Sequence, residues 1–232
     1  MNFLLPFSLA ADFEDDHGFN MKISTMPSLL ICLAVSTSYL SADEKPLSVS
    51  EVLKHSPEEL AQKLGNSSEA GEDHAARLWA VAKRSETDSF LGKSSVQAMQ
   101  RLNEWRQMLN TWQDLKLRAR GIESGGGTMW SHLSARNDAY IEGFLAKHLT
   151  TLSAPPKADG KPFKPNYLKP IYATIDAGVK EFGQDQEHIQ KQAVSLKEEL
   201  QNTYYTLQYL LQSLPEGKTK QAVIKMLKPS AE

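Results

Sequence analysis

Hydrophobic residues recur every three or four positions along much of this 232-residue chain, which is the spacing that places them on one face of an α-helix. The longest such stripe predicts a helix over 185–214, where apolar positions alternate gaps of four and three like the seam of a coiled coil. Only Thr203 interrupts this heptad seam. The seam consists of Ile189, Ala193, Leu196, Leu200, Thr203, Leu207, Leu210 and Leu214.

A second long helix is predicted over 95–120, because apolar residues there follow a spacing of three, four and three. These residues are Leu102, Trp105, Leu109 and Trp112. Gly121 is expected to end the helix, since glycine is common just past a helical C-terminus. The large aromatic side chains of the two long helices are expected to fill or edge the core. They are Trp105, Trp112, Tyr204, Tyr205 and Tyr209.

Shorter helices are predicted around these two. Ser56 followed by Pro57 and two glutamates is a common helix start, and Gly65 ends that helix. Further helices are predicted over 69–84, from Thr128 or Ser131 to about 149, over 170–182 and over 219–227, with a polar loop at 85–93. The helix ending near 149 is expected to bury Leu133, Tyr140, Ile141, Phe144, Leu145 and Leu149.

The expected fold class is all-α. No sustained alternation of apolar and polar residues predicts a strand, and residues 153–166 form a proline- and lysine-rich break between helical segments. We therefore predict an antiparallel helical bundle with two long helices, short flanking helices and this Pro/Lys-rich loop. Residues 43–232 are long enough to form one domain with its own core.

The N-terminal region contains the parts of a secretory signal, but they begin at Met21 and not at Met1. Lys22 supplies a positive charge, an apolar segment follows at 29–35, and small residues lead to Ala42. We expect residues 21–42 to be a signal peptide cleaved after Ala42, or alternatively after Ser38. Residues 1–20, which carry four acidic side chains, are interpreted as an over-extended start.

An uncleaved anchor and a core helix are the alternatives for this apolar segment. It is about fifteen residues long, and a membrane-spanning helix needs about 20. We therefore expect no stable membrane span after signal cleavage, and a periplasmic or secreted protein.

Charge and cysteine content agree with export. The chain has 26 basic and 28 acidic residues; the part after residue 42 has 25 and 24, which argues against bulk electrostatic binding to nucleic acid. The only cysteine, Cys32, lies inside the predicted signal. The mature chain therefore has no intrachain disulfide, a pattern that suits a bacterial periplasm better than a small disulfide-rich secreted fold.

The most distinctive segment, 123–140, carries three consecutive glycines that lead into a predicted helix. Backbone N–H groups of such a turn can face an anion, and polar residues four apart share one helical face. This pattern points to a carboxylate, a phosphate or the polar end of a larger ligand, with His132 as a proton acceptor. The candidate residues are Gly125, Gly126, Gly127, Thr128, His132, Arg136 and Tyr140. The alternative is a flexible interhelical turn.

Other motifs are lacking. The glycine segment has neither the Gly-Lys-Ser/Thr of a phosphate-binding loop nor a strand before it. The histidines show no metal-ligand spacing, and no nucleophile motif occurs. We therefore expect no metal and no cofactor, although a haem held by a methionine and a histidine remains a third hypothesis.

The pattern as a whole favours an exported helical bundle that acts by binding or as a structural protein, and it does not favour an enzyme. We expect the 185–214 helix to pair with a protein partner or with another copy through its seam. The alternative is an enzyme or a small-anion or ligand-binding protein that uses the 123–140 segment.

Overall fold

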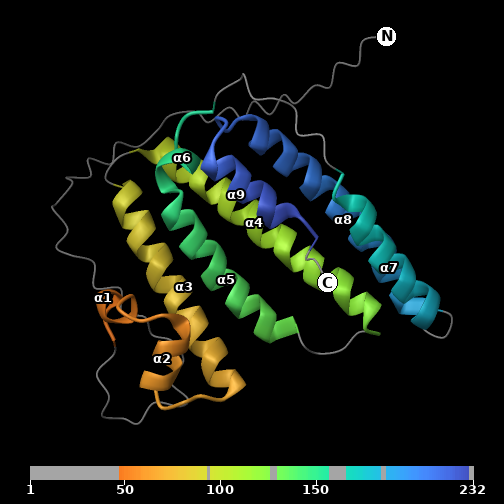
Figure 1. Cartoon of the computed structure of the whole chain (residues 1–232), viewed down its shortest axis with the longest axis horizontal. Coiled ribbons are helices and arrows are strands. Elements are labelled where there is room, and N and C mark those ends of the chain that lie inside the picture. The colour runs from red at the N-terminus through yellow and green to blue at the C-terminus, as the bar shows by residue number, and fades with distance from the viewer. Residues whose placement is uncertain (1–46, 93–94, 126–129, 157–165, 184–186, 230–232) are drawn as a thin grey trace, which may run out of the picture. The chain divides into compact units, whose positions relative to one another are not determined.

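The computed structural model describes residues 47–92, 95–125, 130–156, 166–183 and 187–229. Over these residues the chain forms helices and no strand, which confirms the all-α prediction (Figure 1). The helices are α1 (Val49–Val52), α2 (Pro57–Lys63), α3 (Glu69–Gly92), α4 (Val96–Glu123), α5 (Trp130–Lys147), α6 (Leu149–Leu152), α7 (Leu168–Phe182), α8 (Glu187–Gln212) and α9 (Lys218–Leu227).

Helix α4 is the centre of this arrangement. It packs against α5 on one side and against α7 and α8 on the other, and α5 in turn packs against α3 (Figure 1). The pairs α4–α5, α4–α8 and α7–α8 run antiparallel, as expected of a bundle. α3 and α5 run parallel, because Glu72 meets Arg136 and Trp79 meets Gly143 farther along both helices.

The heptad seam and the tryptophan stripe form the core, as the sequence predicts. Trp112 is fully buried, and its ring lies 5.4 Å from that of Tyr204 on α8. The seam is buried from Ile189 to Leu207, after which Leu211 and not Leu210 takes the buried position. A straight α-helix drifts against a strict heptad repeat, and a step of four corrects for the drift. The α8 seam is therefore covered by the chain's own helices.

Small side chains let α3 and α5 approach closely. Their contact is a separate cluster of four buried alanines, two on each helix, with the edge of Trp79 beside it. At Gly143 an added Cβ would lie 3.3 Å from the Trp79 ring. The four alanines are Ala76, Ala80, Ala135 and Ala139.

Some sequence predictions of loops and of buried positions are wrong. Residues 85–92, expected to be a polar loop, extend α3, because polar side chains there bond within the helix or to a neighbour: Thr87 donates to the Lys83 carbonyl at 2.7 Å. α4 continues through Gly121 to Glu123. Four side chains expected in the core lie at the surface, because each falls outside the contacting arc of its helix. They are Leu133, Tyr140, Tyr205 and Tyr209.

The predicted start of α2 at Ser56 is confirmed. Ser56 accepts a hydrogen bond from the Glu59 amide while the Glu59 carboxylate accepts one from the Ser56 amide, which is a complete capping box. Gly65 follows α2 with φ of 66°, a conformation that favours glycine. Residues 157–165 of the predicted Pro/Lys-rich loop lie outside the described residues.

A buried ion pair connects three helices. The guanidinium of Arg106 on α4 donates from Nε to Glu142 Oε1 on α5 at 2.7 Å and from Nη2 to Asp88 Oδ1 on α3 at 2.9 Å. Asn103 accepts a further bond. Arg106 and Glu142 are 4% and 5% exposed. Burial raises the pKa of Glu142 even though the Arg106 bond acts to lower it. The two charges therefore tolerate burial only together.

Helix α9 is held over α4 at its C-terminal end. The Lys116 ammonium donates to the carbonyls of Met226 and Lys228 at 3.0 and 3.2 Å, which satisfies two of the end groups that a helix leaves unpaired. Burial lowers the pKa of Lys116 to about 8.

Within the described part of the chain, no helix combines the length and the apolar character that crossing a membrane requires.

We expect Arg106→Ala to lower the free energy of unfolding by about 3–5 kcal/mol, because it leaves the buried Glu142 without a counter-charge. The matched control is Arg136→Ala, which removes an interhelical Arg–Glu pair whose side chains are 55% and 41% exposed. That loss should be about 0–1 kcal/mol. Urea unfolding followed by circular dichroism measures both. Equal losses would contradict the assignment of Arg106 as the buried link.

Candidate functional site

The glycine segment begins as a helix-ending turn. Gly125 follows the end of α4 with φ of 72°, and an added Cβ would lie 3.3 Å from the Phe182 ring. Both facts give Gly125 a structural reason to be glycine. Gly126, Gly127 and Thr128 lie outside the described residues, so that the predicted anion site at this turn stays a prediction.

Arg136 and Tyr140, the two members of the predicted polar line whose side chains are described, lie on the exposed side of α5. Arg136 bonds Glu72 of α3 at 2.6 Å, so a carboxylate does reach it from another helix. Both side chains of this pair are half exposed, and Tyr140 is 59% exposed. Neither Arg136 nor Tyr140 lines a cleft described below. The side chain of His132 lies outside the described part of the structure.

A polar cleft of about 320 Å³ lies one third of a turn around α5 from that line. We name it the α5–α8 cleft. Its floor is α4, and its walls are α5 and α8, which both pack on α4. It is lined by Asn110, Thr111, Gln113, Asp114, Leu115, Leu117, Arg118, Ser134, Asn137, Asp138 and Glu199.

The cleft is the continuation of the α4–α5 contact made by the buried ion pair. Arg106 faces Glu142, and one turn farther along each antiparallel helix Asn110 and Asp138 line the cleft. Within a single turn, the contact between α4 and α5 therefore changes from a buried ion pair to polar side chains that line the cleft. The ion pair sets which residues of α4 and α5 face one another in the cleft.

Two carboxylates in the cleft repel one another. Partial burial raises the pKa of Asp138, and the charge of Asp114 raises it further, while Arg77 opposes both effects. No ion pair within 4.0 Å joins either aspartate to a described cation. Asp114 and Asp138 thus present acceptors that the described side chains leave uncompensated at short range.

On the α8 side of the cleft, charge is already compensated. Arg118 donates to both carboxylate oxygens of Glu199 at 2.7 and 3.3 Å, and Ser195 donates to the same carboxylate at 3.0 Å. The bond with Glu199 raises the pKa of Arg118, and the reciprocal bond lowers the pKa of Glu199. The bidentate pair occupies the one arginine that lines the cleft.

An unsatisfied acceptor lies in the same cleft wall. The Oδ1 atom of Asn110 is buried, and no described group donates a hydrogen bond to it. Buried polar atoms without a partner are uncommon in native proteins because each costs about 1–3 kcal/mol. Asn110 therefore places one unpaired buried oxygen in the helix that forms the floor of the cleft.

A second cleft of about 330 Å³ continues past Arg118 toward the end of α4. It is lined by Arg118, Gly121, Ile122, His188, Ile189, Gln192 and Leu196. Arg118 belongs to both clefts, so its bond to Glu199 lies where they meet. This second cleft offers His188 as a titratable group and no carboxylate.

Among the described residues, no three histidine, cysteine, aspartate or glutamate side chains come together in a way that could hold a metal ion. The comparisons with protein-family models, with curated proteins and with solved structures found no match to this chain. The candidate site is therefore argued from its own geometry alone.

The ligand site predicted at 125–140 stays a prediction, and the cleft lies on another face of the same segment. Ser134, Asn137 and Asp138 all lie within 123–140, and they line the cleft. Their partners on α4 also had a sequence signal: Asn110, Asp114 and Arg118 are spaced four apart along a helix whose other face is apolar. The three consecutive glycines are the more conspicuous feature of the sequence, and this second polar line has no comparable motif.

We expect Asp114→Asn to lower the pKa of Asp138 and Arg77→Ala to raise it, because the first removes a repelling charge and the second an attracting one. Carboxyl carbon shifts in an NMR titration measure the pKa directly.

The same shift has a stability signature. Because the folded pKa of Asp138 is raised above 3.8, the folded chain binds more protons than the unfolded chain between that value and the raised one. This group's contribution to the free energy of unfolding therefore falls as the pH rises through that window. Asp138→Asn should remove this fall. An unchanged pH profile in Asp138→Asn would contradict the assignment.

Proposed function

We propose that this chain is an exported binding protein and that its α5–α8 cleft receives a small cation rich in hydrogen-bond donors, such as an organic amine. The observation that carries the proposal is the surplus of acceptors in the cleft. Asp114 and Asp138 offer carboxylate oxygens there, and the arginine of the cleft is already bonded to Glu199.

The charges in the cleft favour a cation over an anion. An anion entering it would face Asp114 and Asp138, and it would have to displace Glu199 to reach Arg118. An ammonium group has three donors and no acceptor, which matches what the cleft presents. Burial is the main cause of the raised pKa of Asp138 and the Asp114 charge adds to it, and a bound cation would offset both by favouring the ionised carboxylate.

The size and construction of the cleft fit a small ligand. Its volume lies at the lower end of the range of ligand sites, about 300–1,000 Å³. Its floor, α4, and one wall, α5, are joined at one end by the buried Arg106–Glu142 pair, and helices hold ligand-binding side chains more accurately than loops do. A preformed site of this kind suits binding.

The proposed location outside the cytoplasm is supported by residues 21–42. Lys22, the apolar segment and the small residues before Ala42 follow the order of a secretory signal. The sole cysteine lies within that segment, so the protein after cleavage would depend on its core alone. An exported binding protein without disulfides suits a bacterial periplasm.

The ligand proposal predicts that 1,4-diaminobutane binds the purified protein and that Asp114→Asn and Asp138→Asn each weaken its affinity about tenfold or more, since each removes a charge-assisted bond. Binding should strengthen as the pH rises through the pKa of Asp138, because the carboxylate must be ionised. Isothermal titration calorimetry measures the dissociation constants.

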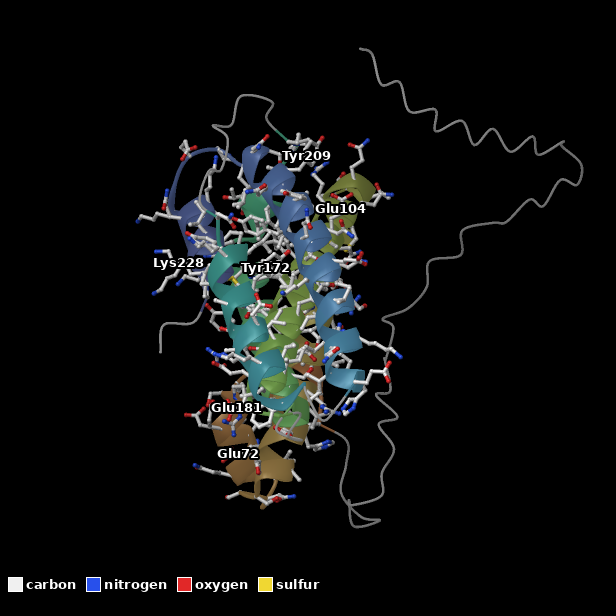
Figure 2. All side chains as sticks on the ribbon, turned by 90° about the vertical axis from the view of Figure 1, so that its right-hand side faces the viewer. Glu72, Glu104, Tyr172, Glu181, Tyr209 and Lys228 are labelled. Atoms are coloured by element: carbon white, nitrogen blue, oxygen red, sulfur yellow. The ribbon has the colours of Figure 1, made fainter. Side chains whose placement is uncertain are left out.

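The matched control for this experiment is Glu104→Gln. It removes one negative charge from the same helix α4 at an exposed position outside the cleft (Figure 2), and it should leave the affinity nearly unchanged. Inorganic phosphate and acetate serve as anionic probes. Binding of an anion that Asp138→Asn strengthens, or an equal loss in all three variants, would overturn the amine proposal.

The export proposal predicts a mature protein that begins at Asp43, or at Tyr39 if cleavage follows Ser38, when the sequence is expressed from Met21 in a bacterium with a periplasm. Mass spectrometry of the periplasmic fraction measures the new terminus. Changing Leu33 to Arg within the apolar segment should keep the chain uncleaved and in the cytoplasm. An intact N-terminus and an unchanged location in both versions would contradict export.

A further inference from the structure

The face of α8 opposite its seam carries three exposed apolar or aromatic side chains among polar ones. Val194, Tyr205 and Tyr209 are 62%, 56% and 73% exposed, and Glu198 is exposed beside them. At 3.6 residues per turn, these four side chains lie within about 60° of one another around the helix. We name this row the outer stripe of α8. The face that α7 and α8 form is turned to the viewer in Figure 2, where Tyr209 is labelled.

The flank of the outer stripe is rigid. Tyr172 of α7 donates its hydroxyl hydrogen to the Lys197 carbonyl of α8 at 2.9 Å, and the Lys197 ammonium lies 5.6 Å from the Tyr172 ring centre. Lys197 also pairs with Asp176 of α7. These bonds tie α7 to α8 beside the stripe, so that a partner would meet a preformed surface and lose little entropy in ordering it.

The order of residues along the stripe is complementary to itself when read in reverse. Val194 and Tyr209 lie equally far from the midpoint between Gln201 and Asn202, and so do Glu198 and Tyr205. Two copies of α8 crossing antiparallel at this midpoint would therefore place Tyr209 of each on Val194 of the other. Each Tyr205 hydroxyl would meet the Glu198 carboxylate of the other copy.

We propose that the outer stripe of α8 is the interface of an antiparallel homodimer. A two-fold axis requires one patch to be complementary to itself, which is the property that the stripe has. Its chemistry agrees, because exposed tyrosines are enriched at interfaces and Tyr205 and Glu198 supply a donor and a charged acceptor. The buried seam cannot serve this role without unfolding the bundle, so the interface lies on the other side of the helix from the one that the heptad pattern indicates. The proposal is independent of the cleft.

The first test is sedimentation velocity over a range of concentrations, with protein purified after expression of the full-length sequence. We expect a monomer–dimer equilibrium, and a dissociation constant raised about tenfold or more by the double change Tyr205→Ser and Tyr209→Ser. The matched control is Tyr140→Ser on α5, which removes an equally exposed tyrosine far from the stripe in sequence and should leave the constant unchanged.

The second test is disulfide trapping, which reads the direction of the pairing. In a Cys32→Ser background, a mixture of Val194→Cys and Tyr209→Cys proteins should form a disulfide-linked dimer on oxidation. Either variant alone should not, because an antiparallel pair separates identical positions by 15 residues, about 22 Å along the helix.

Three results would overturn the proposal. A strict monomer at every concentration excludes a homodimer and leaves the stripe to a different protein. A dimer that the tyrosine changes do not weaken places the interface elsewhere. Cross-linking of Val194→Cys with itself, in place of the mixed pair, shows parallel packing. Because all the altered side chains are exposed, circular dichroism should show unchanged helix content in each variant.

Discussion

The fold depends on burying one guanidinium. Arg106 lies in the middle of the central helix, and its charge is costly to bury unless carboxylates accompany it into the interior. Glu142 and Asp88 supply them from two different helices, so α3, α4 and α5 are bound to a single mutual position. Hydrophobic contacts are less selective, because apolar side chains slide past one another at small cost, whereas a bidentate ion pair has one geometry.

The position fixed by this pair determines what lies beside it. One turn away along α4 and α5, Asn110 and Asp138 come to face the same space, and the α5–α8 cleft opens there. On the other side of α5, the four alanines of the α3 contact are brought together. The same bonded arginine thus sets the register of a polar cleft and of an apolar contact. A shift of α5 by one residue would remove both.

The sequence predicted the helices because their cores are periodic. Burial of one side of a helix requires an apolar residue at every turn, so the pattern of apolar residues predicts the helix. The pattern predicts α4 from Leu102, Trp105, Leu109 and Trp112, and it predicts α8 from the seam. It failed where polar side chains continue a helix, as at Thr87, whose hydroxyl bonds a carbonyl one turn back. Local composition at such positions resembles a loop, and only the tertiary contact of Asp88 with Arg106 distinguishes the two.

The site was harder to predict than the fold for a physical reason. Ile141, Phe144 and Leu145 mark the buried arc of α5 in the sequence, but nothing periodic marks the polar residues beside that arc that come to line the cleft. The sequence therefore placed attention on Arg136 and Tyr140, whereas Ser134, Asn137 and Asp138 line the cleft. Tyr205 and Tyr209 illustrate the same limit. An aromatic residue near an apolar seam is expected to be buried, but whether it is depends on how much of the helix circumference the neighbouring helices cover.

The parallel arrangement of α3 and α5 has a consequence for the order of folding. Two parallel helices cannot be joined by a short turn, so Ala76 and Ala139 meet only after the whole of α4 has returned the chain to its starting end. The antiparallel pair α7–α8 needs no such intermediary, because four residues separate its helices. We expect the α4–α5 and α7–α8 hairpins to form early, since local contacts close at a lower entropic cost, and the alanine contact to form late. Substitutions at those alanines would then act mainly on the rate of unfolding.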